Sequence, residues 1–210
     1  IGDLTSLTKL DLQSCYELVS LPERFGECKS LTKLDLTLCK NLKSLPDRFG
    51  ECKSLTSLNL GECTSLVSLP DSIGDLTSLT ELNLNSCEKL VSLPERIGDL
   101  TSLTELDLFA CEKLVSLPER FGEQLVNLAE LSLHCCVKLQ ELPGSICKMR
   151  SLTKLDLSGD GGGYGYCGPM SLRALPEGFD QLVNLETLIL KYCDKLEALP
   201  AGFAQQTITF

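Results

Sequence analysis

The chain has 210 residues, a formal net charge of −10 at pH 7 and a pI near 4.7. An acidic chain disfavours nucleic acid and anionic membrane surfaces as partners, because both attract Lys and Arg. No apolar run approaches the roughly 18 residues that a membrane span needs, and no signal peptide is visible.

A unit of 24 residues repeats along the chain. The units begin near Ile1, Phe25, Phe49, Ile73, Ile97, Phe121, Ile146 and Phe179. The sixth unit carries one extra residue near Gln124, and the seventh carries about nine in a Gly-rich loop insertion at 158–170. Such units bury their apolar faces against one another, so we expect a single domain of about eight repeats over 1–210. Because Ile1 lies inside a repeat, we interpret the chain as a fragment or processed product.

The unit at 97–120 shows what each repeat should form. Leu106 and Leu108 flank a polar residue, which predicts a short strand with one buried face. One such strand per unit, all in the same direction, predicts a parallel sheet of eight strands. Pro118 removes a backbone donor and excludes a long helix, so the return segment should hold irregular structure and one turn of 3-10 helix.

The units share the pattern LxxLxLxxCxxLxxLPxxxGxL, which resembles the leucine-rich repeat. With Cys in the ladder slot, followed by LxxLP and IGxL, they are similar to the repeats of plant intracellular disease-resistance receptors, in which a nucleotide-binding module precedes the repeats. Ras-binding scaffold proteins also carry LxxLPxxIG units, usually with Asn in that slot. The resemblance implies an α/β fold, a right-handed solenoid with a parallel β-sheet on the concave face and short 3-10 or irregular segments on the convex face. It also implies protein recognition and supplies no catalytic residue.

Seven of the twelve cysteines occupy the ladder slot. They are Cys15, Cys39, Cys63, Cys87, Cys111, Cys136 and Cys193. A cysteine that recurs once per unit should be buried where the chain leaves the strand, and it should be unreactive in the native protein. This placement favours a reducing, cytoplasmic setting over a disulfide framework. In the seventh unit Asp160 takes the slot, so we expect the ladder to break there.

The other cysteines have different expected roles. Cys28 and Cys52 occupy a leucine position of adjacent units, so both should be core residues, with a disulfide between them as an open alternative. There is no CxxC pair and His134 is the only histidine, so the spacing does not favour a zinc site. A Cys–His nucleophile from His134 and Cys135 is not expected either, because adjacent residues should point apart.

Solvent-facing strand positions on the concave face are the candidate binding surface. In the middle units four of these strand residues are acidic. They are Glu81, Glu105 and Glu130 in one column, and Asp107 in the next. Like charges on neighbouring strands repel one another, and a basic protein or peptide would relieve the repulsion. The alternative is that duplication copied a solvated acidic position that has no binding role.

Residues that differ from their counterparts in other units point to the C-terminal half of the same face. They are Phe109, His134, Cys135, Ile189, Lys191 and Tyr192. Exposed aromatic residues are frequent anchors at interfaces. Drift after duplication, or cover for the end of the array, would explain the same residues without a ligand.

The insertion contains GGGYGYCGP at 161–169. Insertions in repeat arrays lie on one face, often the binding face. Tyr164 and Tyr166 are therefore candidate contact residues, and Cys167 is the best candidate for an exposed, reactive thiol. An inert surface loop is the equal alternative. The segment lacks the lysine that a phosphate-binding loop needs.

Together these features predict a protein-interaction or ligand-recognition module that has no enzymatic activity, cofactor or metal. We expect the sensing part of an intracellular immune-type receptor, with a stand-alone scaffold or adaptor for signalling proteins as the alternative. The expected partner is a protein or peptide, with a basic one favoured by the acidic strands. The chain should be monomeric, and open sheet edges would permit weak end-to-end association.

Overall fold

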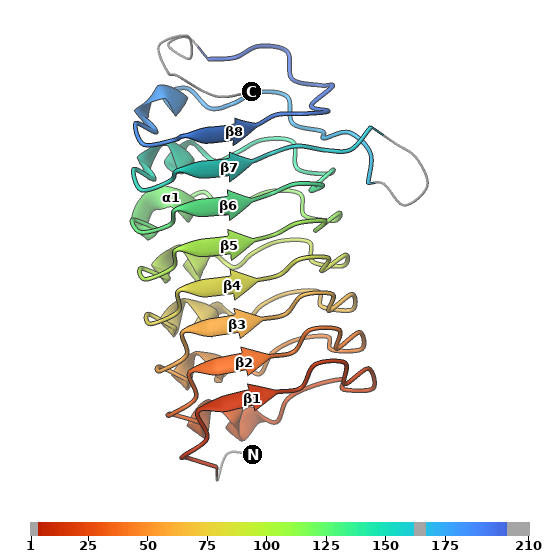
Figure 1. Ribbon diagram of the computed structural model, residues 1–210, viewed down its shortest axis with the longest axis vertical. Coiled ribbons are helices and arrows are strands. Elements are labelled where there is room, and N and C mark those ends of the chain that lie inside the picture. Colours follow the sequence, from red (N-terminus) through yellow and green to blue (C-terminus); the bar gives the residue numbers. More distant parts are fainter. Residues whose placement is uncertain (1–3, 162–166, 201–210) are drawn as a thin grey trace.

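In the part of the chain that the structure describes, eight short parallel strands form one sheet that runs along the length of the solenoid (Figure 1). The computed structural model describes residues 4–161 and 167–200. The strands follow the chain order: β1 (Lys9–Asp11), β2 (Lys33–Asp35), β3 (Ser57–Asn59), β4 (Glu81–Asn83), β5 (Glu105–Asp107), β6 (Glu130–Ser132), β7 (Lys154–Asp156) and β8 (Thr187–Ile189). Each strand pairs in register with the next, so the central leucines of neighbouring strands lie side by side. The predicted parallel solenoid is confirmed.

Within 4–161 and 167–200, the helices on the return side of the solenoid are all short. They are η1 (Glu23–Glu27), η2 (Phe49–Glu51), η3 (Asp71–Asp75), η4 (Glu95–Asp99), α1 (Phe121–Gln124), η5 (Gly144–Lys148) and η6 (Phe179–Gln181). The extra residue of the sixth unit is absorbed in α1, a four-residue α-helix in place of a 3-10 turn, and β5 and β6 stay in register. No helix in the described ranges is long and apolar enough to cross a membrane.

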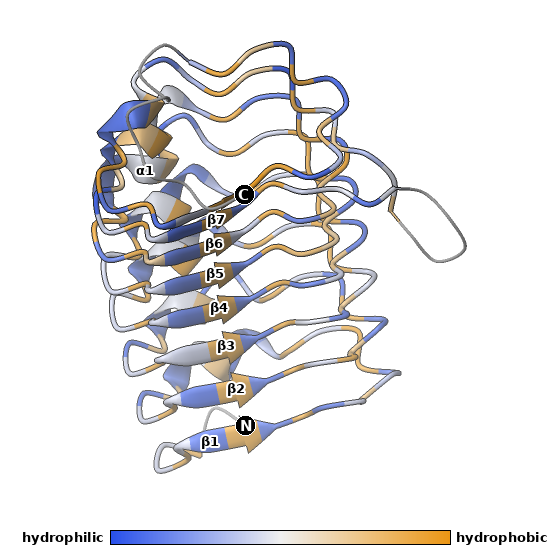
Figure 2. Cartoon of the chain, turned by 45° about the horizontal axis from the view of Figure 1, so that its top comes forward, coloured by the Kyte–Doolittle hydropathy of each residue, from blue (hydrophilic) through white to orange (hydrophobic). Residues whose placement is uncertain are grey.

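A continuous apolar core lies between the sheet and the return segments. Leu82, Leu106 and Leu131 are adjacent in register, and none is more than 2% exposed. Phe25 and Phe49 stack with ring centroids 5.7 Å apart behind the sheet. In Figure 2 the hydrophobic stretches line up from one unit to the next. Because each unit is covered by its neighbours, the middle of the array is buried on both flanks.

The cysteine ladder is a series of hydrogen bonds between units. The thiol of Cys111 donates to the Leu84 carbonyl at 3.3 Å. The other thiol–carbonyl pairs are Cys39–Leu12, Cys63–Leu36, Cys87–Leu60, Cys136–Leu108 and Cys193–Leu157. The ladder breaks in the seventh unit, as predicted, since no cysteine of the described residues donates to the Leu133 carbonyl.

Two of the ladder cysteines are not buried as predicted. Cys15 is exposed and Cys193 is half-buried. They belong to the units of β1 and β8, the outermost strands of the sheet, so among the described residues each has a neighbouring unit on one side only. Cys28 and Cys52 are both buried in the core, as predicted, and no disulfide joins them. Cys52 instead donates its thiol to a backbone carbonyl.

A second ladder, made of threonines, was not predicted. Thr104 Oγ1 donates to the Thr80 carbonyl at 3.0 Å. The equivalent bonds are Thr32–Thr8, Thr56–Thr32, Thr80–Thr56 and Thr153–Ala129. Each threonine lies just before a strand, so this ladder ties successive units together at the start of the sheet. Its sequence signal is a Leu-Thr pair directly before most of the strands, with the threonine next to the first strand residue.

Thiol labelling of the native protein should distinguish Cys15 from the buried ladder. Burial raises the pKa of the Cys111 thiol to about 12 and raises that of Cys87 as well, and the thiolate is the form that reacts. We expect iodoacetamide to modify Cys15 rapidly and to modify Cys87 and Cys111 only after unfolding, as read by peptide mass spectrometry. Urea-unfolded protein, in which all three should react, is the control. Rapid labelling of native Cys87 or Cys111 would contradict the ladder.

Candidate functional site

An open hollow lies on the solvent-facing side of the sheet, over β5, β6 and β7. Its volume is about 380 Å³. Its polar and aromatic lining consists of Glu105, Asp107, Phe109, Glu130, Ser132, His134, Lys154 and Asp156. A second hollow of about 250 Å³, over β3 to β5, shares Glu105 and Asp107 with the first. The two hollows together form a shallow depression across β3 to β7, which we call the sheet-face groove.

The structure places three predicted acidic residues side by side in this groove. Glu81, Glu105 and Glu130 are register partners on β4, β5 and β6. Ser57 Oγ donates to the Glu81 carboxylate at 3.0 Å, and Lys154 Nζ lies 3.2 Å from a Glu130 oxygen. Glu105 makes no side-chain hydrogen bond or ion pair within the described part of the chain. It is therefore the one of these three carboxylates that has neither a hydrogen-bond donor nor a counter-ion among the described residues.

Asp107 has a structural task in the groove. Its Oδ1 accepts the backbone N–H of Phe109 at 2.9 Å and so fixes the turn after β5. Other units repeat this turn in the pairs Asp11–Gln13, Asp35–Thr37, Asn59–Gly61, Asn83–Asn85 and Asp156–Ser158. Asp and Asn side chains commonly cap the backbone two residues further on. The recurrence of Asp and Asn here is thus explained by the turn, and Asp107 orients Phe109.

Phe109 and His134 form a stacked pair at the edge of the groove. Their ring centroids are 5.2 Å apart and the ring planes differ by 21°. The two residues occupy the same position in adjacent units, so the one-strand step of the solenoid brings their rings together. Phe109 is 39% exposed, so part of its ring is available to a partner.

The orientation of the His134 ring is set from the next unit. His134 Nδ1 lies 3.0 Å from the Ser158 carbonyl and 2.7 Å from Ser158 Oγ. The Ser158 hydroxyl donates to Asp156 Oδ1, so its proton is not directed at the imidazole. Nδ1 must then be the donor, and in the neutral ring Nε2 keeps the free lone pair. The repeat places Ser158 one unit after His134 at the same position, but the hydrogen-bonded chain from His134 through Ser158 to Asp156 was not predicted.

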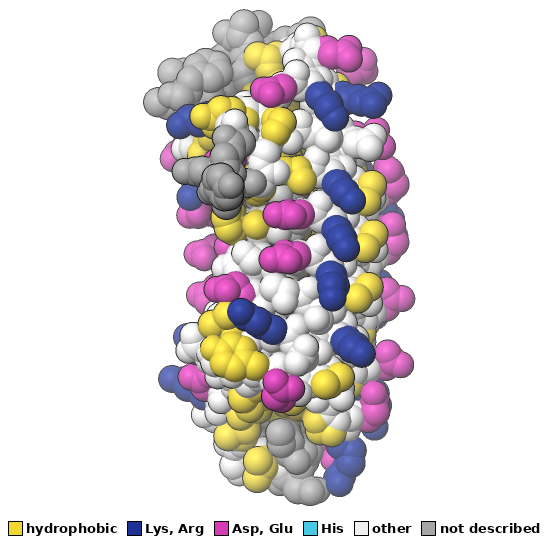
Figure 3. Space-filling model, turned by 90° about the vertical axis from the view of Figure 1, so that its right-hand side faces the viewer, with side chains coloured by type: hydrophobic (Ala, Val, Ile, Leu, Met, Phe, Trp, Pro, Cys, Tyr) yellow, Lys and Arg dark blue, Asp and Glu magenta, His cyan; other side chains and the backbone are white. Residues whose placement is uncertain are grey.

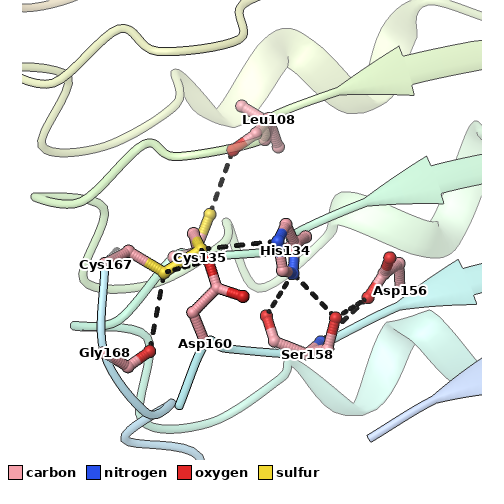
Figure 4. Close-up of a disulfide and its surroundings, with 9 residues drawn as sticks. Leu108, His134, Cys135, Asp156, Ser158, Asp160, Cys167 and Gly168 are labelled. Carbon is pink, nitrogen blue, oxygen red and sulfur yellow. Dashed lines mark hydrogen bonds between the residues drawn. A yellow bond between two sulfur atoms is a disulfide. The ribbon is translucent and has the colours of Figure 1, made fainter. Parts of the chain in front are cut away.

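A disulfide joins Cys135 to Cys167, with the Cα atoms 5.7 Å apart (Figure 4). The prediction of Cys167 as a reactive thiol is therefore wrong. The expectation that His134 and Cys135 point apart is also wrong, because the Cys135 sulfur lies 3.5 Å from His134 Nε2. Cys135 has a left-handed backbone, with φ 63°, which turns its side chain back toward its neighbour. A sulfur held in a disulfide has no thiolate to offer, so the pair does not form a nucleophile.

The disulfide also bears on the prediction that the protein works in a reducing compartment. The ladder cysteines favoured a reducing setting without structural disulfides, whereas Cys135–Cys167 is a bond typical of oxidising environments. It closes the base of the insertion together with a hydrogen bond from the Asp160 N–H to the Gly168 carbonyl at 2.9 Å. The insertion is thereby fastened to the sixth unit, next to the stacked pair.

The remaining predicted contact residues lie outside the groove. Ile189 is on β8, and Lys191 accepts the Gly159 N–H at its carbonyl. Tyr192 is 51% exposed, and its ring packs against Gly161 at the start of the insertion. Lys191 and Tyr192 therefore contact the start of the insertion, whereas Ile189 belongs to the strand. Tyr164 and Tyr166 lie outside the described residues.

The return side of the solenoid is a weaker candidate for binding. A hollow of about 280 Å³ there is lined mainly by charged residues of η4 and α1 and their neighbours. Both arginines of this hollow are paired, Arg96 with Asp75 and Arg120 with Glu123, each at 2.6 Å. The hydrogen bond from Arg120 lowers the pKa of the Glu123 carboxyl. Exposed ion pairs of this kind add little to the stability of the fold. Because their charges are already paired, they attract a charged ligand only weakly.

The side formed by the turns after the strands is regular (Figure 3). Basic and hydrophobic side chains run along it in columns. Val67, Val91 and Val115 recur one per unit, and each is nearly half exposed. Because these valines occupy the same position in three consecutive units and line none of the hollows described above, they provide reference positions for the groove.

Family comparisons agree with the repeat architecture. A family profile described as "Leucine-rich repeat region" matches residues 1–132. A second profile, described as "Zer-1-like, Leucine-rich repeats", matches residues 95–188. The search among curated proteins found no match.

Two solved structures have the same fold. The leucine-rich repeat domain of the type III effector XopL is similar over 98% of this chain and 72% of that chain, with a TM-score of 0.61 and 24% identity. A leucine-rich repeat protein of Leptospira interrogans is 28% identical over 93% of this chain, with a TM-score of 0.51, and this chain spans 60% of its length. Since the first family profile covers more than half of the sequence, the chain belongs to the leucine-rich repeat family.

Proposed function

We propose that the sheet-face groove binds an extended protein or peptide segment that carries a basic residue next to an apolar or aromatic one. The observation that supports this most strongly is the position of the uncompensated Glu105 carboxylate beside the stacked Phe109–His134 pair in one hollow. A Lys or Arg of the partner would lie over Glu105. An apolar side chain would pack on Phe109, since exposed aromatic residues are common interface anchors.

The charge of the groove supports a basic partner. Glu81 and Glu130 flank Glu105 on the neighbouring strands, and only Glu130 has a lysine as its partner among the described residues. The net charge of −10 adds attraction at longer range. Such complementarity increases the association rate and selects among partners more than it increases affinity.

Binding without catalysis is the activity that fits the groove. Leucine-rich repeat domains generally mediate interactions between proteins. The described residues that line the hollow over β5–β7 include no nucleophile activated by a neighbouring base, because the one sulfur near His134 is in a disulfide. We therefore propose a recognition module that has no enzymatic activity of its own.

The finer role that we propose is the sensing part of an intracellular immune-type receptor in the cytoplasm, where the Cys135–Cys167 disulfide would be exposed to reduction. The support for it is the resemblance of the cysteine-containing units to those of plant disease-resistance receptors. A stand-alone scaffold or adaptor is the alternative, and such scaffolds usually have Asn in the ladder slot. The coding sequence upstream of Ile1 separates the two: a nucleotide-binding domain there supports the receptor, and a start codon directly upstream supports the scaffold.

A phage-displayed library of random peptides provides the probe for the groove. We expect selection on the immobilised protein to enrich peptides in which Lys or Arg stands next to an aromatic or aliphatic residue. Phe109→Ala should weaken the binding of such a peptide about tenfold, because truncating an anchor residue costs on the order of 1–2 kcal/mol. Isothermal titration calorimetry with the synthetic peptide measures the change.

The matched control is Val115→Ala, which also truncates an exposed apolar residue but lies outside the groove. It should leave the affinity unchanged. Enrichment of acidic peptides, or equal affinities for the wild type and Phe109→Ala, would rule out the groove as the binding surface.

A further inference from the structure

Four side chains with metal-binding atoms converge where the insertion meets the sixth unit (Figure 4). The Cys135 sulfur lies 3.5 Å from His134 Nε2 and 3.6 Å from Asp160 Oδ2. The Cys167 sulfur lies 3.9 Å from the same Asp160 oxygen. We propose that, when the Cys135–Cys167 disulfide is reduced, these four side chains form a tetrahedral site for Zn²⁺ or a cation of the same class.

The observed spacing fits a tetrahedral site. With Zn–S near 2.3 Å and Zn–N or Zn–O near 2.0–2.1 Å, the edge between a sulfur and a nitrogen or oxygen ligand is about 3.5 Å, and that between two sulfurs is about 3.8 Å. The distances from the Cys135 sulfur to His134 and to Asp160 already match the first value. Ligand atoms of these three residues all lie within 4.8 Å of one another. To form the site, the two sulfurs must separate and Asp160 must move closer to the Cys167 sulfur, from which it lies 3.9 Å away.

The histidine is oriented for coordination before any metal binds. His134 Nδ1 donates to Ser158, which in turn donates to Asp156, and Nε2 faces the Cys135 sulfur. Metal-ligating histidines almost always donate their other ring N–H to a carbonyl, a carboxylate or water in this way. Ser158 is buried, so the support of the imidazole is shielded from solvent.

The four candidate ligands are partly shielded from solvent, but a cation could still reach them. Cys135 is 2% exposed, while His134, Asp160 and Cys167 are partly exposed. A metal could therefore enter from the side of His134 and Asp160. With the cysteine of the sixth unit and that of the insertion both bound, the metal would keep the insertion fastened to the sixth unit after the disulfide is lost.

Reduction of the disulfide and binding of the metal are two separate steps, and atoms and electrons balance in each. A dithiol reductant gives two electrons and two protons to the disulfide, becomes a cyclic disulfide, and leaves a thiol on each of Cys135 and Cys167. Zn²⁺ then forms two Zn–S bonds and releases both thiol protons, with Asp160 bound as a carboxylate and His134 as a neutral imidazole. Disulfide and metal are thus mutually exclusive states of the same two sulfurs.

Co²⁺, which takes tetrahedral thiolate sites and has visible absorption, is the probe. The protein is reduced with a dithiol, freed of reductant under argon, and titrated with Co²⁺. We expect one Co²⁺ per chain, with a thiolate charge-transfer band and the strong visible bands of a tetrahedral complex, and we expect Zn²⁺ to displace it. The disulfide-bonded protein should show none of these bands.

Three variants and one control test the assignment. Cys167→Ser and Asp160→Asn should remove the tetrahedral spectrum or shift it to weaker binding, with circular dichroism unchanged. Ser158→Ala should keep the spectrum and weaken Co²⁺ binding roughly 10–100-fold, as for other residues that position a ligand. Cys15→Ser removes an exposed thiol in the first unit and should bind Co²⁺ like the wild type.

Three outcomes would overturn the site. They are an unchanged spectrum in Cys167→Ser, the weak spectrum of an octahedral complex in the reduced wild type, and no binding by reduced, folded wild type. The peptide experiment uses the disulfide-bonded protein without metal, so failure of either proposal leaves the other standing.

Discussion

Replacing Leu106 with Ala should lower the free energy of unfolding by about 2–5 kcal/mol. Leu106 is the central residue of β5, is 1% exposed, and lies in register between Leu82 and Leu131. Truncation would leave a cavity bounded by three consecutive units. Each of these units is held in register by its strand pairing, so the cavity cannot close without distorting the sheet. Equilibrium urea unfolding, followed by circular dichroism, measures the loss.

The control for this variant is Glu105→Ala, one residue earlier on the same strand. Its side chain is exposed and makes no hydrogen bond or ion pair within the described residues, so the change in unfolding free energy should stay within about 0.5 kcal/mol. Equal losses for the two variants would mean that the alternation of buried and exposed residues along β5 is not what stabilises the array.

Gly50→Ala should have the second large effect. A Cβ on Gly50, in η2, would collide with the carbonyl oxygen of Ser72 in the next unit and lie 2.7 Å from its carbonyl carbon. Both are backbone atoms and cannot rotate away, so the two units would have to separate. We expect a loss of about 1–3 kcal/mol in the same urea experiment.

Gly144→Ala is the matched control, because a Cβ on Gly144 would meet no atom within 4 Å. It should be neutral or stabilise the protein by up to about 1 kcal/mol, since Ala restricts the unfolded chain. If Gly50→Ala and Gly144→Ala behaved alike, the close approach of successive return segments would not be the reason for glycine in the repeat.

Most of the fold could be predicted because one unit specifies it. The leucine spacing in 97–120 sets strand, register and core, and seven further copies place the same residues in the same environment. The prediction failed where neighbours differ: Cys15 and Cys193 lie in the outermost units, which have another unit on one side only within the described ranges. The threonine ladder and the turn made by Asp107 carried a sequence signal, namely their recurrence, but their partners are backbone atoms that a side-chain pattern does not reveal.

The candidate site was only partly predictable, for a related reason. Glu105, Phe109 and the neighbouring glutamates were found from the repeat, because register alone brings them together. The path of the insertion does not repeat, so nothing in the sequence showed that Cys167 returns to Cys135 across 32 residues. The candidate ligands do not have the spacing of a zinc site along the chain, but the insertion and a left-handed turn bring them together in space.

The proposed groove is tested most directly by nuclear magnetic resonance of isotope-labelled protein titrated with a peptide from the selection. Backbone amide shifts should concentrate in β5 and β6 and in the turns that follow them, including Phe109 and His134. Those of η4 on the return side should not change. Shifts centred on η4 or on the column of exposed valines, with none at Phe109 and His134, would contradict recognition through the face of the sheet.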